Sequence, residues 1–234
     1  MAAPAFRSVS AFVAGTLNLT PAEPTGSAED DILVMLCETR MQDTPPSPPS
    51  GWTEAAGSPN DTTQTSGGDN AQLSVFWIRR GASAPSYTTT GGSSPYDHIA
   101  AQVAAFSGCI TSGDPWDATA MTQDGWTGSK HCDAVTTNVA DTLIVLGVAS
   151  GKNATDSTNF FTWANANLTS VTEHMDQTNT VGDGGGVGMA SGVKATAGDT
   201  GTTTFTSDAL PMVQWTGALK PPAAAISHGF FIIG

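Results

Sequence analysis

Charged residues are scarce in this sequence, and basic residues are scarcer still. Only 12% of the 234 residues are charged, eight are Lys or Arg, and the formal net charge is −13. A phosphate backbone is bound by clustered Lys and Arg side chains. The few, scattered basic residues therefore argue against nucleic acid as a partner, and we expect the acidity to keep the protein soluble.

Cysteines and long apolar runs are also few. Cys37, Cys109 and Cys132 make an odd count without the spacing of a metal knuckle, so we do not expect a disulfide framework or a zinc site. Cys37 ends an apolar segment, where a small buried side chain is expected. No apolar run approaches the ~20 residues that cross a bilayer, and Met1 to Phe6 lacks the features of a signal peptide. These absences predict a protein made in a cytoplasm, without a membrane partner.

Metal sites have only weak support. His131-Cys132-Asp133 places three ligand types in a row, but consecutive residues point in different directions, which favours a surface turn over zinc. The oxygen-rich stretches 61–70, 114–124 and 176–183 lack the spacing of a calcium loop. We therefore predict no metal and no cofactor, with polar loops in these places.

Catalytic signals are equally weak. The sequence has no Gly-x-Ser-x-Gly elbow, and none of its four histidines (His98, His131, His174, His228) has an evident nucleophile as partner. Cleavage of a glycan needs two carboxylates on either side of the bond. The candidates are Glu38, Glu54, Glu173 and Asp176, yet nothing in the sequence pairs them. We predict that the protein is not an enzyme.

The sequence does contain an internal repeat, in which similar segments occur twice in the same order. Asp31-Ile-Leu-Val-Met-Leu opens the first copy, and Asp141-Thr-Leu-Ile-Val-Leu opens the second, 110 residues later. The copies close with Phe106-Ser-Gly108 and Trp215-Thr-Gly217. Two similar strand sets predict one domain over residues 1–234, with pseudo-repeats at about 1–138 and 139–234. Two small sandwiches that meet near residue 138 are the alternative.

Short apolar segments separated by Gly, Pro, Asn and Asp predict an all-β fold. We expect a jelly-roll-like sandwich of two sheets. Ile32 to Cys37 and Leu143 to Val148 are apolar at every position, which predicts central strands covered on both faces. Earlier strands are expected at Phe6 to Val13 and Thr16 to Thr20.

Three further segments need an assignment. Residues 97–106 are rich in alanine and follow a possible helix cap. We nevertheless favour a strand, because the matching segment before Trp215 contains a proline and β-formers. Residues 45–49, Pro-Pro-Ser-Pro-Pro, predict a rigid connection and less readily a Pro-rich recognition motif. Phe230 to Ile233 predicts a buried final strand.

Two tryptophans stand out among the six. Trp77 and Trp215 lie in expected strands and are predicted to be core residues. Trp116 and Trp126 bracket an acidic, Gly-containing loop, and loop tryptophans can stack on sugar rings. These two residues are therefore candidates for contact with a glycan or with a partner subunit, and packing over one end of the sandwich is the simpler interpretation.

The order of these signals resembles a group of tailed-bacteriophage virion proteins with a jelly-roll-like β-sandwich. The residues that carry the resemblance are Met1-Ala-Ala-Pro with Phe6-Arg-Ser-Val9, Asp31, Pro49-Ser-Gly-Trp52, Tyr87-Thr-Thr-Thr90, Ala105-Phe-Ser-Gly108, Asp114-Pro-Trp-Asp117, Ala140-Asp-Thr-Leu and Gly229-Phe-Phe-Ile-Ile. They span nearly the whole chain and contain no catalytic signature.

The resemblance implies a structural protein on the virion surface. We expect a capsid decoration protein first and a tail component second, with other virion proteins and further copies of the chain as partners. The alternative is a tail-associated, carbohydrate-binding adhesin that attaches the particle to a host glycan. The sequence lacks the coiled-coil heptads and collagen-like repeats of long fibres, which favours a compact protein.

Overall fold

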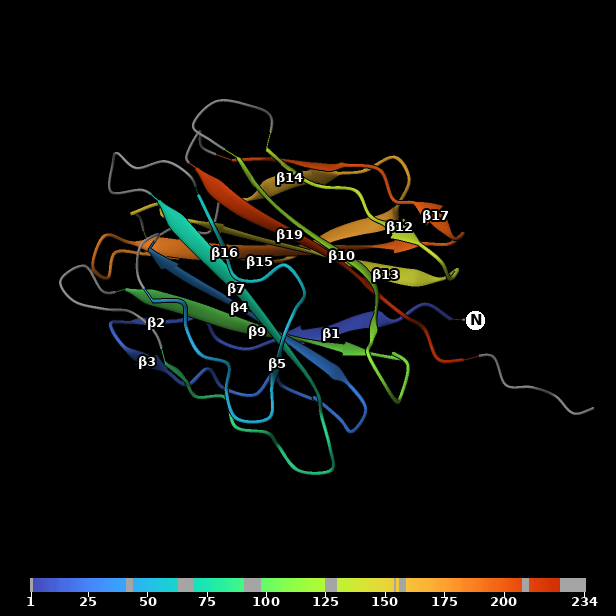
Figure 1. Ribbon diagram of the computed structural model, residues 1–234, viewed down its shortest axis with the longest axis horizontal. Helices are drawn as coiled ribbons and strands as arrows, with labels where there is room; N and C mark the ends of the chain where they lie inside the picture. The colour runs from blue at the N-terminus through green and yellow to red at the C-terminus, as the bar shows by residue number, and fades with distance from the viewer. Residues whose placement is uncertain are drawn as a thin grey trace, which may run out of the picture.

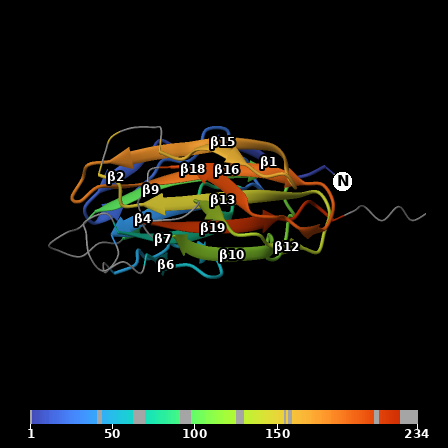
Figure 2. The ribbon, with the colours of Figure 1, turned by 90° about the horizontal axis from the view of Figure 1, so that it is seen from above.

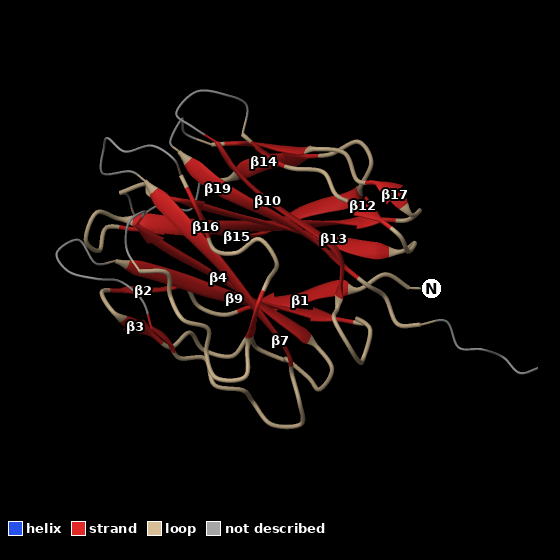
Figure 3. Cartoon of the chain, viewed as in Figure 1, coloured by secondary structure: helices blue, strands red, loops and turns tan. Residues whose placement is uncertain are grey.

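The computed structural model describes residues 2–40, 44–62, 70–90, 98–124, 130–153, 155, 159–207 and 211–223. All regular secondary structure in these ranges is β-strand (Figure 3). The predicted all-β fold is therefore confirmed. Within these ranges no helix is long and apolar enough to cross a membrane.

The strands up to residue 107 are β1 Ala5–Val9, β2 Val13–Gly15, β3 Asn18–Leu19, β4 Ile32–Arg40, β5 Thr53–Glu54, β6 Asn60–Asp61, β7 Ala71–Arg79, β8 Thr89–Thr90 and β9 Ile99–Ser107. The later strands are β10 Trp116–Asp124, β11 His131–Cys132, β12 Thr136–Thr137, β13 Thr142–Ser150, β14 Phe161–Ala164, β15 Thr169–Asn179, β16 Gly185–Lys194, β17 Gly198–Asp199, β18 Thr203–Thr206 and β19 Met212–Leu219.

Two antiparallel sheets form the body of the protein. The first sheet has the order β1-β9-β4-β7-β5, with β2 and β6 added beside β9 and β7, and the second has the order β10-β19-β13-β16-β15. The two sets of strands, blue to green and yellow to red, lie against each other (Figures 1 and 2). Three small sheets flank them: β11-β18-β14, β12-β17 and β3-β8.

The central strands are apolar on both faces because both faces are covered. Ile32, Val34 and Leu36 of β4 point into the core between the sheets. The alternate residues Leu33, Met35 and Cys37 point outward into a second cluster, where Trp52 and Tyr87 cover them. β13 repeats this pattern, with its outward residues packed against Phe160 and Phe205. The predicted central position of both strands is confirmed.

The repeat in the sequence is also a repeat of strand order in the two sheets. In each half the strand that follows the repeated Asp (β4, β13) lies between the strand that closes the half (β9, β19) and the mid-half strand (β7, β16). A further strand, β1 or β10, borders the closing strand. The strands that correspond in the two copies form one sheet each, β4, β7 and β9 in the first and β13, β16 and β19 in the second. The chain changes sheet between β9 and β10, so β10 belongs to the second sheet although it precedes the expected boundary near residue 138. These strand orders make a β-sandwich but do not confirm a jelly-roll connectivity.

Local predictions met different outcomes. The polar loops expected at 114–124 and 176–183 are wrong where these stretches are strand: Trp116–Asp124 is β10, and residues 176–179 are the end of β15. Residues 99–106 of the segment 97–106 are strand, as favoured, because they hydrogen-bond between β1 and β4. Residue 97 lies outside the described residues. The single strand expected from Phe6 to Val13 is wrong: the chain leaves the sheet after Val9 and re-enters as β2. The strand expected from Thr16 to Thr20 is only two residues long, as β3. Residues 45–49 form a connection, in which Ser47 bridges to Thr90. The final strand expected at 230–233 lies outside the described residues.

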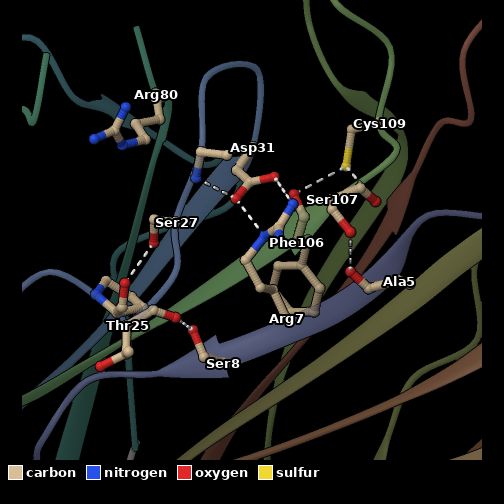
Figure 4. A network of polar contacts seen from close by, with 12 residues as sticks. Ala5, Arg7, Ser8, Thr25, Ser27, Asp31, Arg80, Phe106, Ser107 and Cys109 are labelled. Carbon is tan, nitrogen blue, oxygen red and sulfur yellow. Dashed lines mark hydrogen bonds and ion pairs between the residues drawn. The ribbon is translucent and has the colours of Figure 1, made fainter. Parts of the chain in front are cut away.

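An ion pair fixes the N-terminal strand to the start of β4. Arg7 Nε lies 2.7 Å and Nη2 3.1 Å from the two carboxylate oxygens of Asp31, which is only 2% exposed (Figure 4). The Asp31 carboxylate also accepts a hydrogen bond from the Ala28 amide. A bidentate pair of this kind sets the position of a strand more firmly than a single contact. Asp31, the residue that opens the first copy, is thus a structural anchor.

Candidate functional site

A groove lies where an edge of the first sheet meets an edge of the second. Its volume is about 310 Å³. Its lining comes from β5, the end of β7 and the start of β10: Thr53, Glu54, Ala56, Trp77, Asp114, Trp116, Asp117, Ala118 and Thr119. We call this feature the edge groove. It contains one of the two tryptophans that the sequence singled out.

A β-bulge shapes the wall that β10 provides. Trp116 pairs with Leu219 and Ala118 with Ala218, so Asp117 is the extra residue on β10. A bulge re-aims the inserted side chain, and the Asp117 carboxylate accepts hydrogen bonds from the amides of Asn138 and Val139. Residues 138–139 are thereby tied to β10 beside the groove.

Trp116 is mainly a packing residue. It is 7% exposed, and its ring meets that of Trp215 edge to face, with centroids 4.9 Å apart. The indole Nε1 atoms of both residues are buried and have no hydrogen-bond partner within the described part of the chain. Trp116 therefore offers the groove little exposed ring surface. The other predicted contact residue, Trp126, lies outside the described residues.

Trp77 is the groove residue that sequence reasoning missed. It was predicted to be a core side chain, and it does pack against the core between the sheets, but it is only partly buried. Its neighbours across the strands are Val34 on one side and Thr53 of the short strand β5 on the other. Because β5 has only two residues, it leaves part of the indole uncovered. The alternation of residues along β7 predicts which face of the sheet carries Trp77. It does not predict that the neighbouring strand, β5, is short.

Three carboxylates make the edge groove acidic. The lining includes Glu54, Asp114 and Asp117, and no Lys, Arg or His. Ser58 donates a hydrogen bond to Glu54 Oε1 at 3.0 Å, and the Trp116 amide donates to Asp114 Oδ1 at 3.0 Å. Desolvation raises the pKa of the Glu54 carboxyl, an effect that the Ser58 hydrogen bond partly offsets. The lining thus holds negative charge without a basic side chain to balance it.

The other candidate residues do not assemble into a catalytic or metal site. Glu38 is fully buried against His98, Glu173 lies exposed on β15, and the Asp176 carboxylate accepts the amides of Asn159 and Phe160. Only Glu54 of the four predicted carboxylates lines the groove. Among the residues that the structure describes, no group of three or more His, Cys, Asp and Glu side chains could hold a metal ion.

The surface turn expected at His131-Cys132-Asp133 is wrong, because His131 and Cys132 form the short strand β11, which pairs with β18. Cys132 is fully buried, and its thiol donates to the Gly147 carbonyl, whereas the His131 ring faces Asp133 at 3.2 Å. All three cysteines are free and buried. Burial raises their thiol pKa values, that of Cys109 to about 12, so these thiols stay protonated at neutral pH.

The contact between the buried residues Glu38 and His98 could hardly be predicted from the sequence. His98 Nε2 lies 3.0 Å from Glu38 Oε1, and neither side chain is exposed. The pair joins the end of β4 to the residue before β9. Its one signal is an acidic residue that directly follows a fully apolar run. We assign this pair to the structure of that end of the sandwich, because both side chains are fully buried and neither lines the edge groove.

Comparison with known proteins gives no relative. No protein-family model, curated protein or solved structure matches the chain.

Proposed function

We propose that this protein is a structural component of a bacteriophage virion, displayed on the particle surface as a capsid decoration protein. The proposal starts from the resemblance of the sequence to virion surface proteins, which is carried by strand and turn residues along nearly the whole chain. The function would be mechanical: modest interfaces, repeated by particle symmetry, add up to stable attachment.

The observation that carries the proposal is that β10 is an edge strand. It is nine residues long, and in the described structure it pairs only with β19. Its residues after Trp116 are neither fully buried nor fully exposed. A strand edge with open hydrogen-bonding groups is a ready template for pairing with a neighbouring chain. Such an edge, next to a groove, suits attachment to a subunit of a particle or to a second copy of this chain.

The test is the number of copies in purified particles. Quantitative mass spectrometry, with the major capsid protein as internal standard, should find hundreds of copies per particle. Immunogold labelling should place them over the shell. A handful of copies at one vertex would assign the protein to the tail instead, and absence from washed particles would refute the proposal.

A carbohydrate-binding adhesin is the second candidate, because two tryptophans line the edge groove. Binding to host glycans that is lost in Trp77→Ala, with particle stability retained in a deletion strain, would favour it. Trp77 is the residue to change, since Trp116 is packed against Trp215. Particles from a deletion strain that are less stable than those of the parent phage would favour the decoration role.

A further inference from the structure

We propose that the edge groove binds an arginine side chain of a neighbouring protein. The first argument is charge. Glu54, Asp114 and Asp117 line the groove and no basic residue does, in a chain whose net charge is −13. Clefts lined by one sign of charge concentrate ligands of the opposite sign. The groove is therefore complementary to a cation.

The second argument is the hydrogen-bonding state of the carboxylates. Glu54 Oε1 and Asp114 Oδ1 each accept one bond from the chain itself. Within the described residues, Glu54 Oε2 and Asp114 Oδ2 have no donor. The internal bonds hold the two side chains in place and leave an acceptor on each. A guanidinium has five donors in a planar fork that matches carboxylate acceptors.

The third argument is the indole of Trp77. Trp77 lines the groove and is only partly buried. A guanidinium stacks on an aromatic face and is attracted by its quadrupole, more often than the ammonium of lysine is. An acidic groove with an indole wall thus suits arginine better than lysine. It also suits a cation better than a neutral sugar, which would leave the carboxylates uncompensated.

The groove is preformed. Trp116 is held by Trp215, Asp117 by the amides of residues 138 and 139, and Ser58 connects Glu54 to the Val75 amide. A side chain that docks here orders little of the receiving surface, which lowers the entropic cost of binding. This inference deepens the proposed function by naming the chemistry of the partner. The binding test below reads the groove alone, while the copy number per particle reads the proposed function, so either one can fail separately.

The experiment titrates the full chain with three capped tripeptides, Ac-Gly-Arg-Gly-NH₂, its lysine analogue and its neutral citrulline analogue. Binding is followed by the ¹H–¹⁵N resonances of the tryptophan indoles, with Trp77 assigned from Trp77→Phe. We expect the arginine peptide to shift the Trp77 resonance, the lysine peptide to bind more weakly and the citrulline peptide not to bind. Raising the salt from about 0.02 M to about 0.2 M should weaken arginine binding several-fold.

The charge-neutral variant is Glu54→Gln with Asp114→Asn. Both amides keep the oxygen that accepts from Ser58 or from the Trp116 amide, so the fold should persist. We expect arginine binding to weaken by about tenfold. The matched control is Glu173→Gln: desolvation also raises the pKa of this carboxyl, but Glu173 lies on β15, at the opposite edge of the second sheet. That variant should bind the arginine peptide as the unchanged protein does.

Several outcomes would overturn the inference. Equal binding of the citrulline and arginine peptides would show that charge is not recognised, and tighter binding of the lysine peptide would remove the role of the guanidinium. A response to neutral oligosaccharides with none to arginine would assign the groove to a glycan. Should the double variant fail to fold, the citrulline comparison and the salt dependence of the unchanged protein decide the question.

Discussion

The ring of Phe6 on β1 stacks on the imidazole of His174 on β15. The ring centroids are 3.7 Å apart, and the ring planes are within 8° of parallel. β1 and β15 are edge strands of different sheets, so this contact closes one side of the sandwich. The edge groove lies at the other side, between β5 and β10. The two edges of the sandwich therefore differ: one is joined by an aromatic contact, and the other is hollowed.

Acid should weaken the closed edge through His174. Burial lowers the pKa of this imidazole from its ordinary value of 6.5 to about 4. The folded state therefore resists protonation, while the unfolded state takes up a proton as the pH falls below 6.5. The stability that His174 contributes is present above pH 6.5 and is lost between pH 6.5 and about 4, by up to about 3 kcal/mol.

Urea unfolding at pH 7.5 and pH 4.5 measures this loss. His174→Phe keeps a ring against Phe6 and cannot titrate, so its free energy of unfolding should fall less over the same pH interval. Equal pH dependence in both proteins would mean that carboxylates alone account for acid unfolding.

Arg7→Met should destabilise the protein strongly. It removes both contacts to Asp31, which is almost fully buried, and leaves the carboxylate with the Ala28 amide. An uncompensated buried charge costs about 3 kcal/mol, measurable by urea unfolding. Arg80→Met is the control and should cost much less, because the side chain of its partner Glu23 is 27% exposed, against 3% for that of Asp31. Similar losses in both variants would contradict the anchoring role of Asp31.

Gly217→Ala should also destabilise, although it adds only a methyl group. A Cβ at residue 217 would collide with the six-membered ring of Trp215 and lie 2.8 Å from Trp116 Cζ3. Overpacking of this kind costs about 1–3 kcal/mol. Gly81→Ala is the matched control, because its Cβ would meet nothing within 4 Å. Thermal unfolding of the two variants should separate them clearly, and a neutral Gly217→Ala would mean that the tryptophan pair repacks freely.

Trp116→Ala should cost about 3 kcal/mol of stability, because removing a buried tryptophan leaves a large cavity. The cost of Trp77→Ala should be smaller, since that side chain is partly exposed. Chemical unfolding of both variants tests the order. If Trp116→Ala proved harmless, its contact with Trp215 would not be the structural element that we describe.

The strands that could be predicted were those whose apolar pattern has the same meaning wherever the strand lies in the fold. An unbroken apolar run such as Ile32 to Cys37 needs cover on both faces wherever it lies. The repeated text fixed which strands correspond. Short strands such as β5 and β6 escaped prediction, because two residues hold no period and form only where a long neighbour offers an edge. The edge groove could not be predicted either, because its residues come from three separate segments of the chain.

The sequence by itself determined an all-β protein in two corresponding halves, because alternation, turn residues and repetition are local or act at a fixed spacing. Only the tertiary structure decided that the corresponding strands of each half lie in one sheet, that Trp116 packs on Trp215, and that Trp77 and three carboxylates line one groove that has no basic residue in its lining. These outcomes depend on which faces and edges meet when the two sheets close over their shared core. No single segment carries that information.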